Sequence, residues 1–165
     1  MAPRNSRKLF VTTPSDREIV LTRTFDAPRA LVFQAWTKPE HVRRWYGCAE
    51  FELVVCDIDL RVGGQYRYTT CAPDGVHHTM TGIYRDIAPP ARIVHTERYE
   101  TTGFISEDAI VTTIFEERDG GTTLTTTVLH RSRENRDGHL NSGMERGASE
   151  TFDRLADLLA NMTVA

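Results

Sequence analysis

Two polar side chains two positions apart are the best candidates for chemistry in this sequence. His95 and Glu97 lie in the run 92–99, whose composition is typical of a β-strand. Residues i and i+2 of a strand project to the same face, so both side chains enter an apolar interior if Ile93 and Tyr99 mark the inward face. A buried acid/base pair in a cleft is a catalytic candidate. In the alternative register the pair faces outward and is structural or solvated.

Aromatic side chains are concentrated in two segments that can border a cavity. Both tryptophans, Trp36 and Trp45, lie within ten residues of each other on a predicted pair of short helices. Tyr66 and Tyr68 alternate onto one face of a strand, where a hydroxyl can orient a polar ligand atom. Ordinary core and sheet packing is the alternative for all four. The predicted cavity residues are Trp36, Trp45, Tyr46, Tyr66, Tyr68, Met80, Tyr84, Met144 and Ala148.

The residue types that bind metals or act as nucleophiles do not form a recognisable set. His77 and His78 are adjacent, so on a strand they point to opposite faces, and no third ligand has suitable spacing. The three cysteines are odd in number and lack paired metal spacing, which favours reduced thiols over disulfides. Nucleotide-binding loops and nucleophile elbows are absent from the sequence. We therefore expect no metal and no cofactor.

Composition restricts the partners and the compartment. The chain has 165 residues and a formal net charge of −3, which provides no broad field for nucleic acid or an anionic membrane. No apolar run approaches the ~20 residues of a membrane span, and the N-terminus lacks the apolar core of a secretory signal. We expect a cytoplasmic single domain over 17–163 after a flexible tail over 1–16, as a monomer or a homodimer.

The elements that position these residues follow from periodicity. Asp26 can cap a first helix that has Pro28 at its start, and Thr37 with Glu40 has capping-box spacing for a second helix before Gly47. Alternating apolar residues then predict about seven strands in a mostly meandering antiparallel order. These strands are expected near 18–24, 51–55, 66–68, 78–84, 92–99, 109–117 and 122–130.

A long amphipathic helix is predicted at the C-terminus, over 134–162. Its apolar stripe contains Leu140, Met144, Ala148, Thr151, Leu155, Leu158 and Met162. A curved antiparallel sheet with this helix across its concave face, and a helix pair after the first strand, buries every apolar stripe. This α+β arrangement is a helix-grip. It leaves space between helix and sheet, because a long helix cannot fill a curved trough along its whole length.

Several motifs occur in the order in which one known family has them. They are Phe25-Asp-Ala-Pro-Arg29, Trp36-Thr-Lys-Pro-Glu40, Trp45-Tyr-Gly47, Asp59-Leu-Arg-Val-Gly-Gly64, Pro73-Asp-Gly75, Asp119-Gly-Gly-Thr122, Gly143-Met-Glu-Arg-Gly147 and Asp153-Arg-Leu155. With them the chain resembles the START-like (SRPBCC) superfamily and, within it, the bacterial family homologous to the activator of heat-shock protein 90 ATPase. The resemblance implies a helix-grip domain with an internal cavity. Ala148 stands where relatives often have a larger side chain, which favours a roomier cavity.

Three functions agree with these observations. Binding of a small hydrophobic or aromatic molecule in the cavity fits both the fold and the aromatic residues, and we favour it. A cyclase, dehydratase or hydrolase in the same cavity requires His95 and Glu97 to converge with further polar groups. The resemblance also implies a co-chaperone-like domain that acts on a heat-shock ATPase, with the chaperone as its partner.

Overall fold

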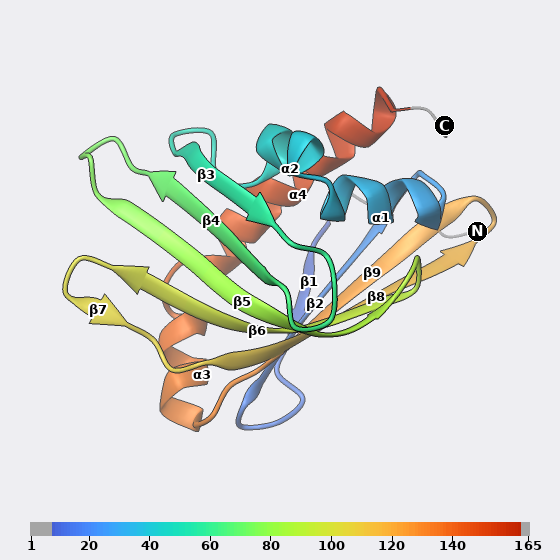
Figure 1. The fold of residues 1–165 in the computed structure, drawn as a ribbon. Coiled ribbons are helices and arrows are strands. Elements are labelled where there is room, and N and C mark those ends of the chain that lie inside the picture. Colours follow the sequence, from blue (N-terminus) through green and yellow to red (C-terminus); the bar gives the residue numbers. More distant parts are fainter. Residues whose placement is uncertain (1–7, 163–165) are drawn as a thin grey trace.

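The computed structural model describes residues 8–162, in which a nine-stranded antiparallel sheet is combined with four helices (Figure 1). The strands are β1 (Phe10–Thr12), β2 (Glu18–Phe25), β3 (Glu52–Ile58), β4 (Gln65–Cys71), β5 (His77–Ala88), β6 (Arg92–Thr101), β7 (Phe104–Ile105), β8 (Ala109–Arg118) and β9 (Gly121–Leu129). The helices are α1 (Arg29–Thr37), α2 (Pro39–Trp45), α3 (Arg133–Leu140) and α4 (Met144–Ala160). The strand order is β1-β2-β9-β8-β6-β5-β4-β3, and β7 pairs with β6.

All seven predicted strands are present, and two short strands join them. The strand β7 has two residues and β1 has three, which is too short to give an alternating pattern in the sequence. β1 pairs with β2 and Leu9 is buried, so this part of the predicted flexible tail is packed against the sheet. Residues 1–7 of that tail, and residue 163 of the predicted domain, lie outside the described residues.

Two irregularities help to curve the sheet. The pairing register shifts between Leu53 and Val55 in β3, and between Tyr84 and Asp86 in β5. An extra residue in one strand of a pair bends that strand and increases its twist. The strands therefore wrap around α4, which crosses the concave side of the sheet (Figure 1). The buried core between them contains Phe25, Phe115 and Leu155, each no more than 1% exposed.

The helix pair after β2 lies where the sequence predicts it, but its caps differ from the prediction. Pro28 occupies the N-cap of α1 and Lys38 that of α2, and neither helix has a side-chain cap. The predicted Asp26 cap and the predicted capping box are therefore wrong. The Thr37 hydroxyl donates instead to the Phe33 carbonyl oxygen at 2.7 Å, within its own helix. Prolines in the first turns supply the start signals that these caps would otherwise give.

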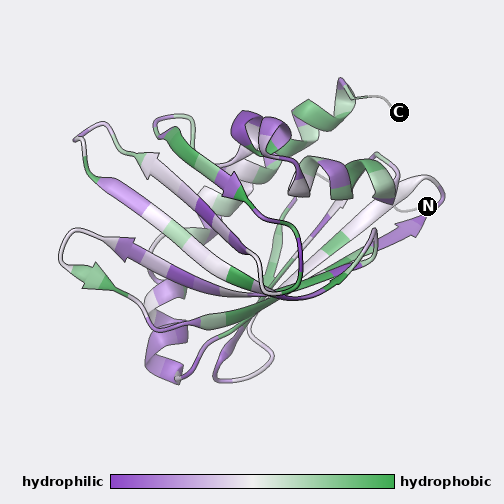
Figure 2. Cartoon of the chain, in the orientation of Figure 1, coloured by the Kyte–Doolittle hydropathy of each residue, from purple (hydrophilic) through white to green (hydrophobic). Residues whose placement is uncertain are grey.

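The predicted C-terminal helix over 134–162 is broken into α3 and α4. Residues 141–143 separate the two helices, and Gly143 has a φ of 83°, a left-handed conformation that glycine adopts without steric cost. α3 is one of the most hydrophilic segments in Figure 2 and buries no residue, whereas α4 buries Phe152, Leu155, Leu158 and Leu159. No helix within residues 8–162 is long and apolar enough to cross a membrane.

An ion pair between a buried arginine and an exposed aspartate links α4 to the sheet. Arg23 of β2 is only 1% exposed, and its Nη1 lies 2.7 Å from Oδ1 of Asp153 on α4. The guanidinium also lies over the Phe25 ring, 5.4 Å from its centroid. A charged group enclosed in this way keeps α4 in register with β2, because sliding the helix would leave the arginine unpaired.

Candidate functional site

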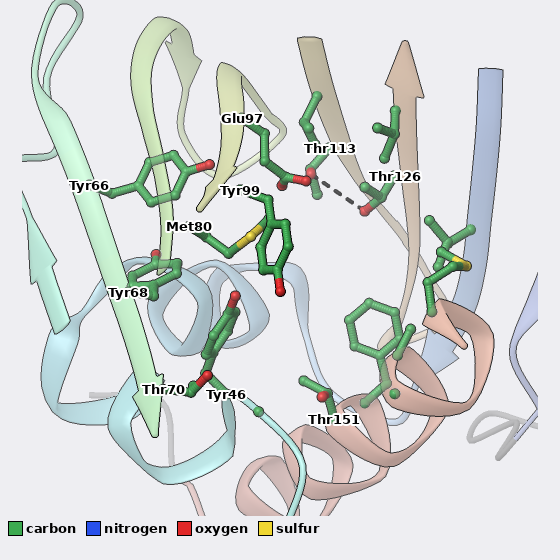
Figure 3. A pocket seen from close by; sticks show the side chains of 18 of the residues that line it. Tyr46, Tyr66, Tyr68, Thr70, Met80, Glu97, Tyr99, Thr113, Thr126 and Thr151 are labelled. Atoms are coloured by element: carbon green, nitrogen blue, oxygen red, sulfur yellow. Dashed lines mark hydrogen bonds between the residues drawn. The ribbon is translucent and has the colours of Figure 1, made fainter. Parts of the chain in front are cut away.

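A cavity of about 460 Å³ lies between α4 and the concave face of the sheet. Strands β2, β4, β5, β6, β8 and β9 supply one wall, and the helices with the segment after α2 supply the other. Figure 3 shows side chains of both walls directed into this space. We call it the main cavity. Its volume is within the range of pockets that hold small organic ligands.

The sheet wall is built around Tyr66. Its hydroxyl donates to the Thr96 carbonyl oxygen at 3.1 Å, and the side chain is almost completely buried. The neighbouring residue on β5 is Gly82, where an added Cβ would lie 2.4 Å from the Tyr66 ring. Tyr66 also packs against Tyr68, with 5.0 Å between ring centroids. The position of this aromatic wall is therefore set by the backbone of β5 and β6.

The opposite wall begins with the two tryptophans. Trp36 and Trp45 pack with 5.0 Å between ring centroids, and the Trp45 indole N–H donates to the Ala35 carbonyl oxygen at 2.8 Å. Tyr46 follows directly and contacts Tyr68 across the cavity, with 4.7 Å between centroids. A belt of aromatic rings thus joins α1 and α2 to β4. Such rings offer a large apolar surface with flat faces for a planar ligand.

The α4 side of the wall includes three small side chains between the larger Met144 and Phe152. Gly147 and Ala148 line the main cavity, and Thr151 lines it one helical turn after Gly147. The α2–β3 segment beside them is held by Arg154, whose Nη1 donates to the Gly47 carbonyl oxygen at 2.8 Å. The empty volume next to α4 therefore results from side-chain size, while the helix itself is firmly attached.

The strand β6 places His95 and Glu97 on the inward face, together with Ile93 and Tyr99. Nδ1 of His95 lies 2.8 Å from the Thr96 carbonyl oxygen, which assigns the proton to Nδ1. Nε2 makes no hydrogen bond with any residue in 8–162 and is left as an acceptor. Burial lowers the pKa of His95, although the Thr96 carbonyl opposes this shift, so the imidazole is neutral near pH 7.

Glu97 is a carboxyl group without a protein partner. Within the described part of the chain it makes no hydrogen bond and no ion pair, and Figure 3 shows it directed into the space between the β4 tyrosines and the β8–β9 threonines. Burial raises the pKa of Glu97 from its ordinary 4.5 to about 7. The group therefore exchanges between the acid and the carboxylate near neutral pH, which suits a general acid or base.

The tyrosine hydroxyls of the main cavity remain protonated at neutral pH. Burial, followed by the charge of Glu97, raises the pKa of Tyr46 and of Tyr66. Burial also raises the pKa of Tyr68, and it raises that of Tyr84 to about 12. These groups can donate hydrogen bonds to a ligand but cannot act as phenolate nucleophiles near pH 7. Of the sequence-predicted site residues, His95 and Glu97 are the candidates for acid/base chemistry in the cavity.

A second cavity of about 590 Å³ adjoins the main one. It lies between α3 and the β6–β7 hairpin, and five residues line both spaces: Met80, Glu97, Tyr99, His139 and Met144. His139 of α3 meets His130 with 3.0 Å between Nδ1 and Nε2. Burial, with a smaller contribution from His130, lowers the pKa of His139 to about 4, so this pair is neutral. The carboxyl of Glu97 thus stands at the junction of the two cavities.

The structure brings all eleven sequence-predicted site residues to the main cavity. They are Trp36, Trp45, Tyr46, Tyr66, Tyr68, Met80, Tyr84, His95, Glu97, Met144 and Ala148. His78, which the sequence analysis considered only as a metal ligand, also lines the cavity, and its Nδ1 lies 2.6 Å from the Tyr99 hydroxyl. No group of three or more residues suited to metal binding occurs in the region 8–162.

Sequence reasoning missed two kinds of lining residue. His139 belongs to α3, whose separation from α4 was not predicted, and its place at the cavity depends on that break. Thr113 and Thr126 face the cavity from β8 and β9, with 3.4 Å between their hydroxyl oxygens. The period-two pattern of these strands contained that information. Threonine is common at exposed strand positions, so its presence in these strands did not identify Thr113 and Thr126 as cavity-lining residues.

Comparison with solved structures places the fold in a large group. A crystal structure from Rhodobacter sphaeroides is 25% identical, with coverage of 94% of this chain and 99% of that one and a TM-score of 0.87. A putative uncharacterized protein from Rhizobium leguminosarum is 28% identical. The match covers 94% of this chain and 98% of that one, with a TM-score of 0.73. A protein named AHSA1 from Silicibacter pomeroyi is 18% identical, covers 87% and 98%, has a TM-score of 0.72 and shows the shared fold alone.

Comparison of the sequence with protein families identifies one of them. No curated protein matches the chain significantly. The model of the family described as "Activator of Hsp90 ATPase homolog 1-like protein" matches residues 26–160, which include α1, all of α4 and every lining residue of the main cavity except Leu21. This chain belongs to the family of activator of Hsp90 ATPase homolog 1-like proteins, with a helix-grip fold.

Proposed function

We propose that this protein binds a small, largely apolar aromatic molecule in the main cavity. One observation supports this proposal above all others: a space of about 460 Å³ is bordered by tryptophan, tyrosine and phenylalanine rings, and no lysine or arginine of residues 8–162 lines it. Folding leaves this volume open beside a firmly anchored helix. Binding of a ligand of matching shape is favourable, because it removes the apolar surface of this space from water.

A neutral fluorescent aromatic compound, N-phenyl-1-naphthylamine, tests the proposal directly. Its emission rises on transfer to an apolar site, and Trp36 and Trp45 provide a second signal because both line the cavity. The variant Ala148→Phe puts a ring into the space beside α4 and should weaken binding at least about tenfold. Ala160→Phe adds the same ring at an exposed position of the same helix and should leave binding unchanged. Equal binding by both variants, or no binding to the wild type, would contradict the proposal.

Acid/base catalysis in the same cavity is the second candidate. Glu97, with a pKa of about 7, can serve as the general acid, and the unoccupied Nε2 of His95 can serve as the general base. A cyclase, dehydratase or hydrolase of this type should lose turnover in the double variant His95→Gln, Glu97→Gln while ligand affinity stays within about tenfold. Turnover that survives this double change would exclude both residues as the catalytic pair.

A co-chaperone role is supported by the family description, which names an Hsp90 ATPase. It would use an exterior surface, so it predicts stimulation of a chaperone ATPase that Ala148→Phe does not affect. Ligand binding and chaperone stimulation can therefore be separated by one variant.

A further inference from the structure

The charge that lines the main cavity is of one sign, negative. Within residues 8–162, 27 residues line it; Glu97 is the single carboxylate among them and none is a lysine or arginine. Three histidines complete the titratable nitrogen groups, and each already has one ring nitrogen beside a protein atom: His78 at Tyr99, His95 at Thr96 and His139 at His130. The cavity can therefore hold one negative charge and has no permanent positive charge to balance it.

The second cavity has the same sign of charge. Glu97, Glu107 and Glu134 line it, and none of the 14 lining residues in the described part of the chain is a lysine or arginine. Its lining includes the exposed Phe104 at the start of β7, a strand that Figure 2 colours as hydrophobic. Because the two cavities share Glu97, a cationic molecule would encounter favourable potential from the surface to the main cavity, while an anionic one would be repelled along the same route.

Glu97 itself lacks the partner that a buried carboxylate needs. Such a group is stabilised by a charge-assisted hydrogen bond, and nothing within residues 8–162 offers one. Folding has already removed most of Glu97 from bulk water and leaves it partly exposed to the cavity, so the main added cost of binding is the dehydration of the ligand's own charged group. Tyr46 and Tyr66 lie close enough for the Glu97 charge to raise their pKa. Their aromatic faces can also attract a cation.

We propose that the preferred ligands of the main cavity are aralkyl amines, in which an alkyl chain separates an aromatic ring from a protonated primary or secondary nitrogen; the nitrogen binds Glu97 while the ring lies among the tyrosines and tryptophans. This inference rests on the proposed ligand-binding function and names its substrate class. The ammonium group donates its hydrogen bonds to the carboxylate, and the apolar remainder fills the aromatic belt. A carboxylate ligand of the same shape meets Glu97 with a like charge and is excluded.

Three compounds with the same ring and chain length separate the contribution of the charged group to binding from that of the ring: 4-phenylbutylamine, 4-phenylbutanol and 4-phenylbutanoate. Each competes with N-phenyl-1-naphthylamine at about pH 8, where Glu97 is ionised and the amine is protonated. We expect the amine to displace the probe at a concentration at least about tenfold lower than the alcohol, and the carboxylate to be the weakest of the three. Equal displacement by amine and alcohol would overturn the inference and leave the binding function intact. No binding of the probe would overturn both.

The variant Glu97→Gln removes the charge and keeps the shape. It should abolish the advantage of the amine, leave the alcohol within about twofold and strengthen the carboxylate. Glu97→Leu should do the same, and both variants should fold because Glu97 has no hydrogen-bond partner to lose. Glu116→Gln, at an exposed position of β8, is the matched control that should keep the amine preference. An amine preference that persists in Glu97→Gln would assign it to another group and refute the proposal.

Discussion

Replacement of Glu97 by glutamine should stabilise the protein, and by an amount that depends on pH. The unfolded chain releases the Glu97 proton near pH 4.5 and the folded chain near 7, so the folded state binds more protons between these values. Its free energy of unfolding therefore falls as pH rises through this window. The gap, converted at about 1.4 kcal/mol for each pH unit, gives about 3 kcal/mol above pH 7. This is an upper value, because part of Glu97 is exposed to the cavity.

Urea unfolding followed by tryptophan fluorescence measures this effect. The wild type and Glu97→Gln should differ little at about pH 5, and the variant should be more stable by about 2 to 3 kcal/mol at about pH 8. Histidines also titrate in this range, but they are common to both proteins and cancel in the difference. A difference that stays constant from pH 5 to pH 8 would show that the carboxyl is hydrated in the folded state, and it would refute the reasoning.

Three further predictions concern packing and the histidine pair. Leu155→Ala should lower the free energy of unfolding by about 2 to 4 kcal/mol, because Leu155 is fully buried under the sheet, and chemical denaturation with an unchanged m-value would verify this. Gly82→Ala should cost at least about 2 kcal/mol and disturb Tyr66, since the new Cβ would lie 1.9 Å from the Thr96 carbonyl oxygen; a melting temperature equal to that of the wild type would contradict it. The imidazole of His139 should titrate near pH 4 in NMR spectra, so the folded state loses stability as pH falls from about 6.5 toward 4, and a midpoint above 6 would show that the ring is solvated.

The sequence predicted the strands well, because they depend on local periodicity. Alternation along β6 places His95 and Glu97 on the same side as Ile93 and Tyr99, but the sequence left open which side faces inward, and the structure places these four at the cavity. The break between α3 and α4 was not predicted, although residues 141–143 are poor helix formers. An apolar stripe that continues across such residues is the same whether the segment forms one helix or two. Packing against the sheet determines which of the two forms.

The order of the strands and the size of the cavity depend on information that no local pattern contains. The pairing of β2 with β9 joins segments about 100 residues apart, and the curvature comes from register shifts within β3 and β5. The environment of Glu97 is likewise a result of distant segments, because Tyr46 and Tyr66 approach it from different elements. Residue types indicated which groups share a face of a strand, and the tertiary structure determined that this carboxyl lacks a partner.

The unequal construction of the two cavity walls has a consequence for how the cavity of this protein can change shape. On the sheet side, Tyr66 is locked by a main-chain hydrogen bond and by Gly82, so a change there disturbs the fold. On the α4 side, Gly147, Ala148 and Thr151 make no side-chain hydrogen bonds within residues 8–162, while the anchoring ion pair uses other faces of the helix. The shape of the main cavity can therefore change through substitution of a few small residues on α4, while the stability of the fold depends on the opposite wall.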